Sequence, residues 1–470
     1  MAFTIFTHTS GRAAPSEKDS PEKAWIRAHL QPVLLAADIN VYSFARAFHE
    51  AYGIRSLVLA TGMRSPIAES SIIDFREVPG LHDPKVFLRV LDDLYRDVQE
   101  QFHGEKSLML IGCWDQYVRM IVENRAQLED KYILPYADES VLNKIILKQD
   151  FYALCEYYGL AYPKTFVHTP ATGDDFHLDF DFPVVVKASD SVDYKEHPFQ
   201  GAKKVFFVNH RAQLLDVLHR TYAAGYSGSM IVQELIPGGD STMYDLHVYV
   251  GRDHRVKLMN LGHVLLEEHS STGIGSDAAT LNTYNEGLME SIRTLLESIG
   301  FEGLCDCDIK RDPRDGVFKI LEINIRQGRS HYRVTGAGYN LASLLVRDYF
   351  LHEPIDATWV RTPYFWHVVP LPVVLAFVRQ KATRRQILAL IQQGKTSHSL
   401  RYPADLSMRR RAKLLRRDAR MTASYVKTDG VPAMRRHLNT LARRVTTLTA
   451  RAHELPSYAH TLVARVKDAV

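Results

Sequence analysis

The chain has 470 residues and a net charge of +4, and its 46% hydrophobic and 24% charged residues are typical of a soluble globular protein with two to four structural units. Its four cysteines are too few for a disulfide-stabilised scaffold, so we expect a reducing cytoplasm. The first residues lack a basic start and a long apolar run, which argues against a signal peptide. The longest apolar stretch, residues 363–378, is short and interrupted by Pro370 and Pro372, so we predict no transmembrane helix.

The charge is distributed unevenly along the chain. Residues 351–470 carry 22 basic and 7 acidic side chains, a net of +15, whereas residues 1–350 carry 36 and 47, a net of −11. The tail segments RRQILALIQQGK and SMRRRAKLLRRDARMTASYVK are typical of basic amphipathic helices. Three explanations remain open: packing on the acidic body of the protein, attachment to anionic lipid, and nucleic-acid binding, for which no recognised nucleic-acid fold is present.

The first part of the chain has the pattern of a parallel sheet. Residues 1–30 look irregular and flexible. Buried-strand patterns then alternate with helical patterns, and the strands are expected at residues 31–40, 56–61 and 107–115. Ligands of such sheets bind outside the carboxyl ends of the strands, which would place Asp38, Asn40 and Asp115 at the mouth of a site. The same residues also suit helix caps, and a glycine-rich dinucleotide motif is absent.

The middle of the chain contains two lysines in unusual positions. Residues 138–159 are predicted to form one helix, which places Lys144 and Lys148 on the same face. Lys187 projects from a valine-rich strand, where it needs an anion, either a phosphate or a neighbouring carboxylate. A polar loop at residues 189–204 follows. Further strands are expected at residues 182–189, 205–208, 230–236 and, as a hairpin, 247–262.

Residues 304–330 read as a second hairpin with one polar and one apolar face. Asp306 and Asp308 share a face of the first strand, and Glu322, Asn324 and Arg326 share a face of the second. Carboxylate and amide oxygens are suitable ligands for Mg²⁺ bound to a nucleotide phosphate. A half-exposed hairpin with ordinary surface charges is the alternative. The opposite face, which contains Cys305 and Cys307, is expected to pack in the core.

The order of these features resembles the ATP-grasp ligases. A helix lysine, a strand lysine, a polar loop, the linker VQELIPGGD and an acid followed by E-x-N-x-R occur in sequence between residues 31 and 350. Within that superfamily the chain is similar to the bacterial D-aspartate ligases of peptidoglycan synthesis. The phrases ADINVYSFARAFHEAYGIRSL, GCWDQYV, HPFQGAKKVFFV, LGHVLLEEHSSTGIG and EINIRQGRSHYRVT carry this similarity, and so does LRYPADLSMRRRAKL in the tail.

The resemblance implies an α/β protein with defined parts. These are a flexible N-terminus (1–30), a Rossmann-like parallel-sheet domain (31–137), an ATP-grasp domain (138–350) and a basic, mainly helical C-terminal region (351–470). It also implies roles for individual residues. The nucleotide phosphates would contact Lys148 and Lys187, the adenine and ribose would contact Gln233, Glu234, Leu235, Ile236 and Asp240, and magnesium would be bound by Asp308, Glu322 and Asn324. Arg326 would steady the acyl phosphate. Arg329 and Arg333 would pair either with the substrate's second carboxylate or with acids of the protein itself.

The resemblance further implies an ADP-forming carbon–nitrogen ligase that uses ATP and Mg²⁺, with two ions expected and Mn²⁺ as a substitute. The β-carboxylate of D-aspartate would be activated as an acyl phosphate and joined to a lysine or ornithine side-chain amine of a peptidoglycan precursor. Loops at 189–204 and 272–276 would exclude water. The expected location is the cytoplasm, with peripheral attachment at the inner face of the membrane. The alternatives are an amino-acid or peptide ligase outside wall synthesis and a non-catalytic ATP-grasp binding module.

Overall fold

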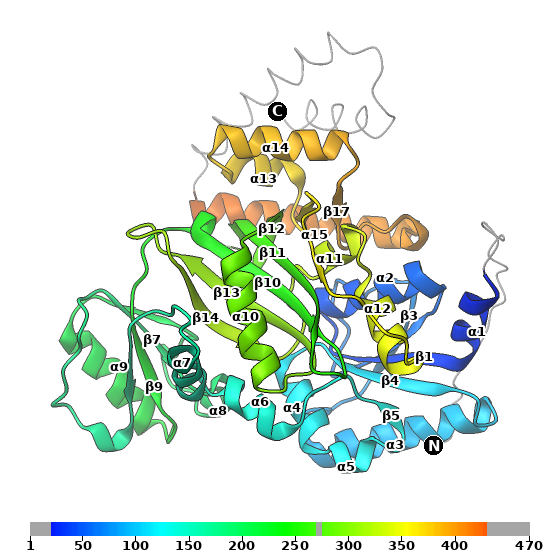
Figure 1. The fold of residues 1–470 in the computed structure, drawn as a ribbon, viewed down its shortest axis with the longest axis horizontal. Helices are drawn as coiled ribbons and strands as arrows, with labels where there is room; N and C mark the ends of the chain where they lie inside the picture. The colour runs from blue at the N-terminus through cyan, green and yellow to red at the C-terminus, as the bar shows by residue number, and fades with distance from the viewer. Residues whose placement is uncertain (1–19, 269–274, 430–470) are drawn as a thin grey trace, which may run out of the picture.

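The computed structural model describes residues 20–268 and 275–429. In these residues the strands form three sheets, which occupy different parts of the molecule in Figure 1. The N-terminal sheet lies beside a large central sheet, and a small sheet projects on the other side. Helices α13, α14 and α15 lie at the top of this view. None of the described helices is long and apolar enough to cross a membrane.

The N-terminal sheet is parallel, as the alternation of strands and helices predicts. Its order in the described chain is β3-β2-β1-β4-β5, and all its pairings are parallel. The strands are β1 (Leu30–Leu35), β2 (Ser56–Ala60), β3 (Ile73–Glu77), β4 (Ser107–Gly112) and β5 (Tyr132–Ile133). The helices are α1 (Pro21–His29), α2 (Ile39–Tyr52), α3 (Pro84–Gln101), α4 (Asp115–Glu123) and α5 (Arg125–Leu128).

Helix α1 corrects the expectation of an irregular segment at residues 1–30. Ser20 caps the helix by accepting a hydrogen bond from the Lys23 N–H, and Pro21 occupies the first helical position. Ile26 is fully buried, so the helix is fixed by core packing. Residues 1–19 lie outside the described part of the chain.

The small sheet forms a lobe with its own core. Its strands are antiparallel in the order β6-β9-β7-β8, and its core includes Val184, Val186 and Val232. The strands are β6 (Thr165–His168), β7 (Val184–Ala188), β8 (Phe206–Val208) and β9 (Met230–Glu234). The helical elements are α6 (Glu139–Ile146), α7 (Lys148–Tyr157), η1 (Pro170–Thr172), α8 (Ser191–Glu196) and α9 (Arg211–Ala223).

Two of these helices differ from the sequence prediction. The single helix expected over 138–159 is broken at Leu147, which has extended dihedral angles (φ −78°, ψ 115°). Lys148 is therefore the first residue of a new helix. The polar loop 189–204 contains α8, which begins after Asp190 because that side chain accepts hydrogen bonds from the Val192 and Asp193 N–H groups.

The large sheet has the order β14-β13-β10-β11-β12-β16-β17, with β15 beside β11. Its strands are β10 (Met243–Val250), β11 (Val256–Glu267), β12 (Asp277–Thr283), β13 (Gly303–Arg311), β14 (Phe318–Asn324), β15 (Thr358–Trp359), β16 (Phe365–His367) and β17 (Thr396–His398). The helical elements are η2 (Asp240–Thr242), α10 (Glu286–Ser298), α11 (Tyr332–Gly336), α12 (Leu341–Leu345), η3 (Val346–Phe350), α13 (Leu371–Phe377), α14 (Lys381–Gln392), η4 (Pro403–Asp405) and α15 (Met408–Asp429).

The C-terminal region is therefore not only helical. Strands β15, β16 and β17 all follow residue 350 and extend the large sheet. Helix α15 is fastened to the N-terminal domain, because the fully buried Arg410 donates to Ala68 O at 2.8 Å and to Pro66 O at 2.9 Å. The region after residue 350 is thus built into both neighbouring parts of the protein.

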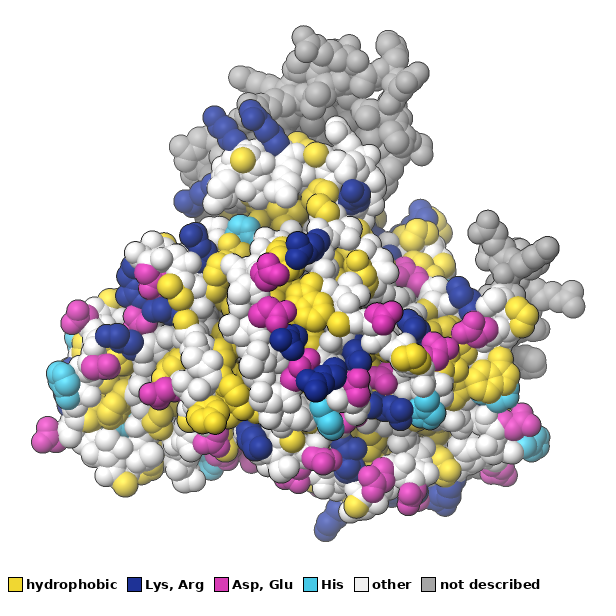
Figure 2. Space-filling model, in the orientation of Figure 1, with side chains coloured by type: hydrophobic (Ala, Val, Ile, Leu, Met, Phe, Trp, Pro, Cys, Tyr) yellow, Lys and Arg dark blue, Asp and Glu magenta, His cyan; other side chains and the backbone are white. Residues whose placement is uncertain are grey.

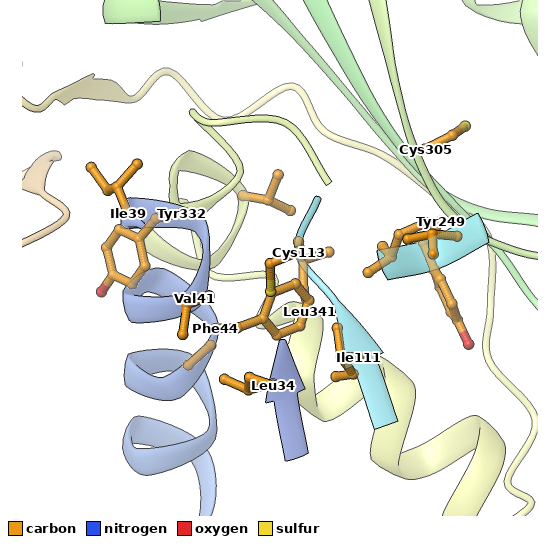
Figure 3. Close-up of a cluster of buried hydrophobic side chains, with 14 of the residues drawn as sticks. Leu34, Ile39, Val41, Phe44, Ile111, Cys113, Tyr249, Cys305, Tyr332 and Leu341 are labelled. Carbon is orange, nitrogen blue, oxygen red and sulfur yellow. The ribbon is translucent and has the colours of Figure 1, made fainter. Parts of the chain in front are cut away.

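One hydrophobic core joins the N-terminal and large sheets. Figure 3 shows side chains from both in a single cluster, with Leu34 and Ile111 from parallel strands and Cys305 from the hairpin. All four cysteines are buried free thiols, as expected for Cys305 and Cys307. Because this core is continuous, the carboxyl ends of the N-terminal strands are held against the polar face of the hairpin.

Candidate active site

A cavity of about 460 Å³ opens where the carboxyl ends of β1 and β4 meet the β13–β14 hairpin. The N-terminal domain lines it with Asp38, Asn40, Arg64, Trp114 and Asp115. The large sheet and the segment after it contribute Asp306, Asp308, Glu322, Asn324, Arg326 and Arg329. The cavity therefore brings together residues that the parallel-sheet argument and the hairpin pattern predicted separately.

Asp38 serves both as a helix cap and as a cavity wall. It caps α2 by accepting from the Asn40 and Val41 N–H groups, and its other oxygen accepts from the Trp114 indole at 2.8 Å. Asp115 has a different function, because the side chain makes no cap at α4 and instead contacts Arg326. Both alternatives therefore apply to Asp38, whereas Asp115 lines the cavity without capping a helix.

The hairpin register places its acids opposite one another. Asp308 pairs with Glu322 and Asp306 pairs with Asn324 across the antiparallel strands. The Asn324 amide nitrogen donates to Asp308 Oδ2 at 3.3 Å and to the Asp306 carbonyl at 3.4 Å. Cross-strand neighbours on one face lie close together, so the polar face concentrates oxygen atoms at one point.

These oxygens are suited to a magnesium ion both by their negative charge and by their type as ligand atoms. Burial raises the pKa of Asp308 well above its ordinary value, and the charges of Asp306 and Glu322 raise it further. A bound divalent cation would relieve this repulsion among neighbouring carboxylates. The all-oxygen donor set of Asp308, Glu322 and Asn324 suits Mg²⁺ better than a softer metal.

Both predicted lysines lie beside Glu322. Lys148 Nζ is 3.4 Å from Glu322 Oε2 and donates to the Ser189 carbonyl at 3.5 Å. Lys187 is partly buried on β7; burial lowers its pKa, while the Glu322 charge acts in the opposite direction. For Glu322, burial raises the pKa, but Lys148, Lys204 and Lys187 together hold it well below its usual range. Glu322 is therefore ionised and surrounded by cations.

Arg326 reaches from the hairpin to the N-terminal domain. Its Nε donates to Asp115 Oδ2 at 3.2 Å, and its Nη1 donates to the Gln327 carbonyl at 2.9 Å. Burial lowers its pKa, but Asp115, Asp306 and Asp308 outweigh that effect and raise it. The guanidinium is thus a permanent positive charge between the acids of both domains.

The two other predicted arginines are paired with acids of the protein. Arg329 Nη2 lies 2.5 Å from Glu268 Oε2 at the cavity wall. Arg333 is fully buried, donates to both oxygens of Asp245 at 2.7 and 3.0 Å, and contacts Asn260. A substrate cannot reach Arg333 without displacing these buried bonds, so the expected substrate role is wrong for this residue. Arg329 remains in position to contact a ligand.

Asp306 also belongs to a buried charged cluster that extends from the hairpin onto the adjacent strand β10. Its Oδ1 lies 3.0 Å from His247 Nδ1, and His247 Nε2 lies 3.1 Å from Asp245 Oδ2. Burial lowers the pKa of His247, but Asp306 and Asp245 outweigh it and raise the pKa. Two carboxylates thus face an imidazolium and the Arg333 guanidinium, and the cluster is balanced in charge without an ion. Gly328 is required here, because a Cβ would collide with the Asp306 carboxylate.

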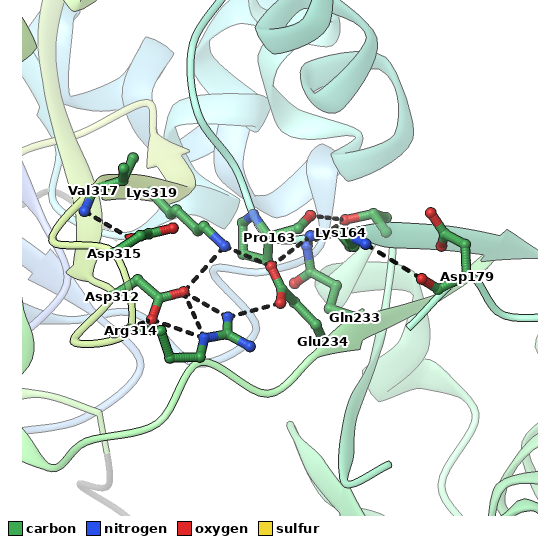
Figure 4. A network of polar contacts seen from close by, with 11 residues as sticks. Pro163, Lys164, Asp179, Gln233, Glu234, Asp312, Arg314, Asp315, Val317 and Lys319 are labelled. Atoms are coloured by element: carbon green, nitrogen blue, oxygen red, sulfur yellow. Dashed lines mark hydrogen bonds and ion pairs between the residues drawn. The ribbon is translucent and has the colours of Figure 1, made fainter. Parts of the chain in front are cut away.

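The predicted adenine-binding segment lies at the end of β9, at the edge of the small lobe. Gln233 is buried and its side chain donates to Thr165 Oγ1 at 2.7 Å. Figure 4 shows the Glu234 carboxylate held by Lys319 and Arg314 of the hairpin, at 2.7 Å each. Both cations also contact the fully buried Asp312. This network joins β9 to the hairpin that carries the acids.

The remaining predicted positions are placed as follows. Ile236 is buried and Leu235 is half-buried in the segment after β9. Asp240 begins η2, and its Oδ2 accepts from the Glu267 N–H at 2.9 Å. Residues 269–274 lie outside the described chain, and Gly275 and Ser276, which follow them, line the cavity. The described cavity lining includes the hairpin acids Asp306, Asp308 and Glu322. It does not include Lys148, Lys187 or Asp240.

Sequence reasoning missed several cavity residues, namely Arg64, Trp114, Lys204, Glu268, Asp277 and Arg417. Lys204 ends the polar loop, directly before β8, and its charge lowers the pKa of Glu322. Its position at the end of a loop predicted to cover the phosphates could have identified Lys204 from the sequence. Arg417 lies on α15, more than ninety residues beyond the hairpin, and only the general basicity of the tail pointed to it.

Over 389 residues the chain is 36% identical to the D-aspartate ligase of Enterococcus faecium (strain Aus0004), a match that covers 81% of this chain and 92% of that protein. The chain belongs to the D-aspartate ligase family. As a member of this family it is an ATP-dependent, ADP-forming carbon–nitrogen ligase, and its fold is the ATP-grasp fold. A scan against protein-family models gave no match.

Solved structures agree with the ligase at the level of the fold. The biotin carboxylase domain of Hydrogenobacter thermophilus 2-oxoglutarate carboxylase, crystallised with MgADP, ADP and bicarbonate, has a TM-score of 0.52 at 11% identity and covers 70% of the ligase and 71% of that chain. The N5-carboxyaminoimidazole ribonucleotide synthetase of Thermus thermophilus has a TM-score of 0.50 at 15% identity, with coverage of 71% and 82%.

Proposed function

We propose that the ligase activates the β-carboxylate of D-aspartate with ATP and joins it to the side-chain amine of lysine or ornithine in a peptidoglycan precursor. The observation that carries this proposal is the similarity to the Enterococcus D-aspartate ligase, which extends over 92% of that protein. The cavity supports it, because carboxylate, amide and guanidinium groups converge at one place. The alternative substrates belong to amino-acid or peptide ligation outside wall synthesis.

The proposed reaction has two steps. The substrate carboxylate attacks the γ-phosphorus of ATP, which forms an acyl phosphate and releases ADP. The acceptor amine then attacks the acyl carbon, the carbon–oxygen bond breaks, and phosphate leaves as the amine loses a proton. A carboxylate is a poor acylating agent in water, so the acyl phosphate provides the leaving group. The protein then accelerates the reaction mainly by positioning the reactants and neutralising their charges.

We assign the residues in this reaction by charge and position. Lys148 and Lys187 neutralise nucleotide phosphates, and Gln233 to Ile236 with Asp240 hold the adenosine. Asp308, Glu322 and Asn324 would hold Mg²⁺, one or two ions, with Mn²⁺ as a substitute; the ion supplies charge neutralisation at the phosphates. Arg326 steadies the acyl phosphate and the tetrahedral intermediate. Its pairing with Asp115 fixes the guanidinium at the cavity wall.

We further propose that the basic C-terminal region brings the ligase to anionic lipid at the inner face of the membrane. Exposed cations on α15 surround two exposed apolar side chains, Met408 and Leu415. The exposed cations are Arg409, Arg411, Lys413, Arg416, Arg420 and Lys427. Figure 2 shows further Lys and Arg side chains, without Asp or Glu beside them, over the region of α14. A lipid-linked wall precursor would be met at such a surface.

The test of the main proposal is release of ADP and phosphate by purified protein with Mg-ATP and a panel of D- and L-amino acids. Each acid is assayed with and without a peptidoglycan precursor as the acceptor. Stimulation by D-aspartate, with product formation only when the precursor is present, supports the proposal. Stimulation by L-acids alone would contradict the D-aspartate assignment and leave the ligase class intact.

A further inference from the structure

The cavity wall contains a cationic cluster whose members come from two distant parts of the chain. Arg329 follows the hairpin, and Arg417 lies on α15; both line the cavity. The Arg417 side chain is 13% exposed, and its Nη1 donates to the Val368 carbonyl at 2.9 Å. A guanidinium offers five N–H donors, and this backbone bond uses one of them.

In the described part of the chain, the ion pairs around Arg417 contain more guanidinium groups than carboxylates. Arg329 is paired with Glu268, and Arg401 is paired with Asp418 at 2.5 Å, whereas Arg417 is 3.9 Å from Asp418. Three guanidiniums therefore face two carboxylates. Burial and, to a smaller extent, the positive charge of Arg329 lower the pKa of Arg417 to about 10, while Asp418 and Glu268 oppose these effects. A bound carboxylate would complete this cluster.

We propose that Arg417, together with Arg329, binds the α-carboxylate of the amino-acid substrate and so selects dicarboxylic amino acids. This assignment rests on the proposed function, in which the β-carboxylate reacts at the acids of the hairpin. The substrate then needs a second anion site in the same cavity, away from those acids. Guanidinium groups bind carboxylates with two parallel hydrogen bonds, so an arginine pair is well suited to this role.

On this assignment α15 has a direct function in specificity. The buried side of this helix carries Arg410, which fastens it to the N-terminal domain, and Arg417, which reaches the cavity. Arg89 on α3 is exposed and has no role in the proposed site. Arg417 and Arg89 thus provide a pair for substitution, since either change to methionine removes one positive charge from the protein.

The experiment compares Arg417→Met, Arg417→Lys and the control Arg89→Met with two substrates. D-aspartate carries both carboxylates, and β-alanine is the same molecule without the α-carboxylate. We expect Arg417→Met to raise the KM for D-aspartate by about 10- to 100-fold, because a hydrogen bond to a charged group is lost. The KM for β-alanine and the KM for ATP stay at wild-type values. Arg417→Lys gives an intermediate KM for D-aspartate, and Arg89→Met leaves all three KM values unchanged.

A structural role for Arg417 predicts a different result. Loss of the bond to Val368 would lower the thermal midpoint and raise the KM for both substrates and ATP together, which would overturn the proposal. An unchanged KM for D-aspartate would overturn it as well. If the wild-type enzyme prefers another dicarboxylic amino acid, and Arg417→Met raises that KM selectively, the D-aspartate assignment fails and the role of Arg417 stands. If the wild-type enzyme accepts only monocarboxylic amino acids, both fail.

Discussion

Asp115 at the start of α4 accepts a 3.2 Å hydrogen bond from Arg326 at the end of the hairpin, so one ion pair joins the two walls of the cavity. Asp115→Asn removes the charge that orients the guanidinium. We expect kcat to fall about 10- to 100-fold, since a charge-assisted bond contributes about 1.5–3 kcal/mol, while the KM for ATP changes little. Steady-state kinetics with ATP and amino acid varied in turn will measure this.

The matched control for that variant is Asp130→Asn, an exposed acid of the same domain. A purely structural role for Asp115 would instead lower the thermal midpoint and change kcat and KM together. If kcat stays at the wild-type value, Asp115 does not position Arg326 for the reaction.

Glu322→Gln removes a carboxylate that lies between Lys148 and Asp308. The remaining oxygen set binds a cation more weakly, and several kcal/mol of charge stabilisation are lost at the transferred phosphate. We expect amino-acid-dependent ADP release below about 1% of the wild-type rate, with an unchanged circular dichroism spectrum. Glu129→Gln, an exposed position, is the control, and wild-type turnover in Glu322→Gln would remove the metal assignment.

Two buried histidines predict a loss of stability in acid. His367 and His398 are paired in register on β16 and β17. Burial lowers the pKa of His367 from 6.5 to about 4, and burial together with the His367 charge lowers that of His398 well below 6.5. Between pH 6.5 and 4 the unfolded chain therefore binds protons that the folded chain excludes. The free energy of unfolding should therefore decrease as the pH decreases, by about 2 kcal/mol for each imidazole at pH 5.

Chemical denaturation at pH 8 and pH 5 will measure this loss. His367→Asn should reduce the difference between the two pH values by about half, whereas the exposed His177→Asn should leave it unchanged. A wild-type protein that is equally stable at both pH values would show that these imidazoles titrate normally.

The network around Asp312 predicts a structural link to nucleotide binding. Asp312 is fully buried, and hydrogen bonds from Arg314, stronger than the opposing effect of burial, hold its pKa well below its usual range. Asp312→Asn leaves two cations facing Glu234 alone. We expect about 2–3 kcal/mol less free energy of unfolding, below the usual cost for a fully buried pair because Arg314 is half-exposed. Asp315→Asn, in the same turn but exposed, is the control for both stability and the KM for ATP.

The lipid proposal is tested with point variants because a truncation would also remove Arg417. Arg416 and Arg420 are exposed and follow the exposed Leu415 on α15. Replacement of both by glutamine should weaken binding to anionic vesicles by roughly 10- to 30-fold, at about 1 kcal/mol for each cation. Lys85 and Arg89, both exposed on α3, form the control pair. Equal binding by the two double variants, or equal binding to neutral vesicles, would exclude α15 as the lipid-binding surface.

The sequence predicted those parts of the site that depend on local periodicity. Alternation along the hairpin predicted which residues share a face, and the register of Asp308 with Glu322 confirms that pattern. Asp38 and Asp115 were found because the ends of parallel strands meet at one edge. The buried thiols Cys305 and Cys307 follow from the same alternation.

Features that depend on long-range packing could not be predicted in this way. No proline or glycine marks the break at Leu147, so the helical pattern continued through it. Arg333 looked like a substrate ligand because Asp245 and Asn260, its partners, lie more than seventy residues away in the sequence. Arg417 reaches the cavity only because α15 packs across two domains. Charge composition indicates a basic tail and does not show which arginine points inward.

The attachment of α15 also has a consequence for biosynthesis. Arg410 bonds to Ala68, 342 positions earlier in the chain, and β17 completes a sheet that begins with β10. Contacts of such large sequence separation form late, after the intervening chain has left the ribosome. The cavity wall that contains Arg417 is therefore assembled last. A nascent chain that stops before α15 would lack this wall, so a complete site exists only after α15 has been synthesised.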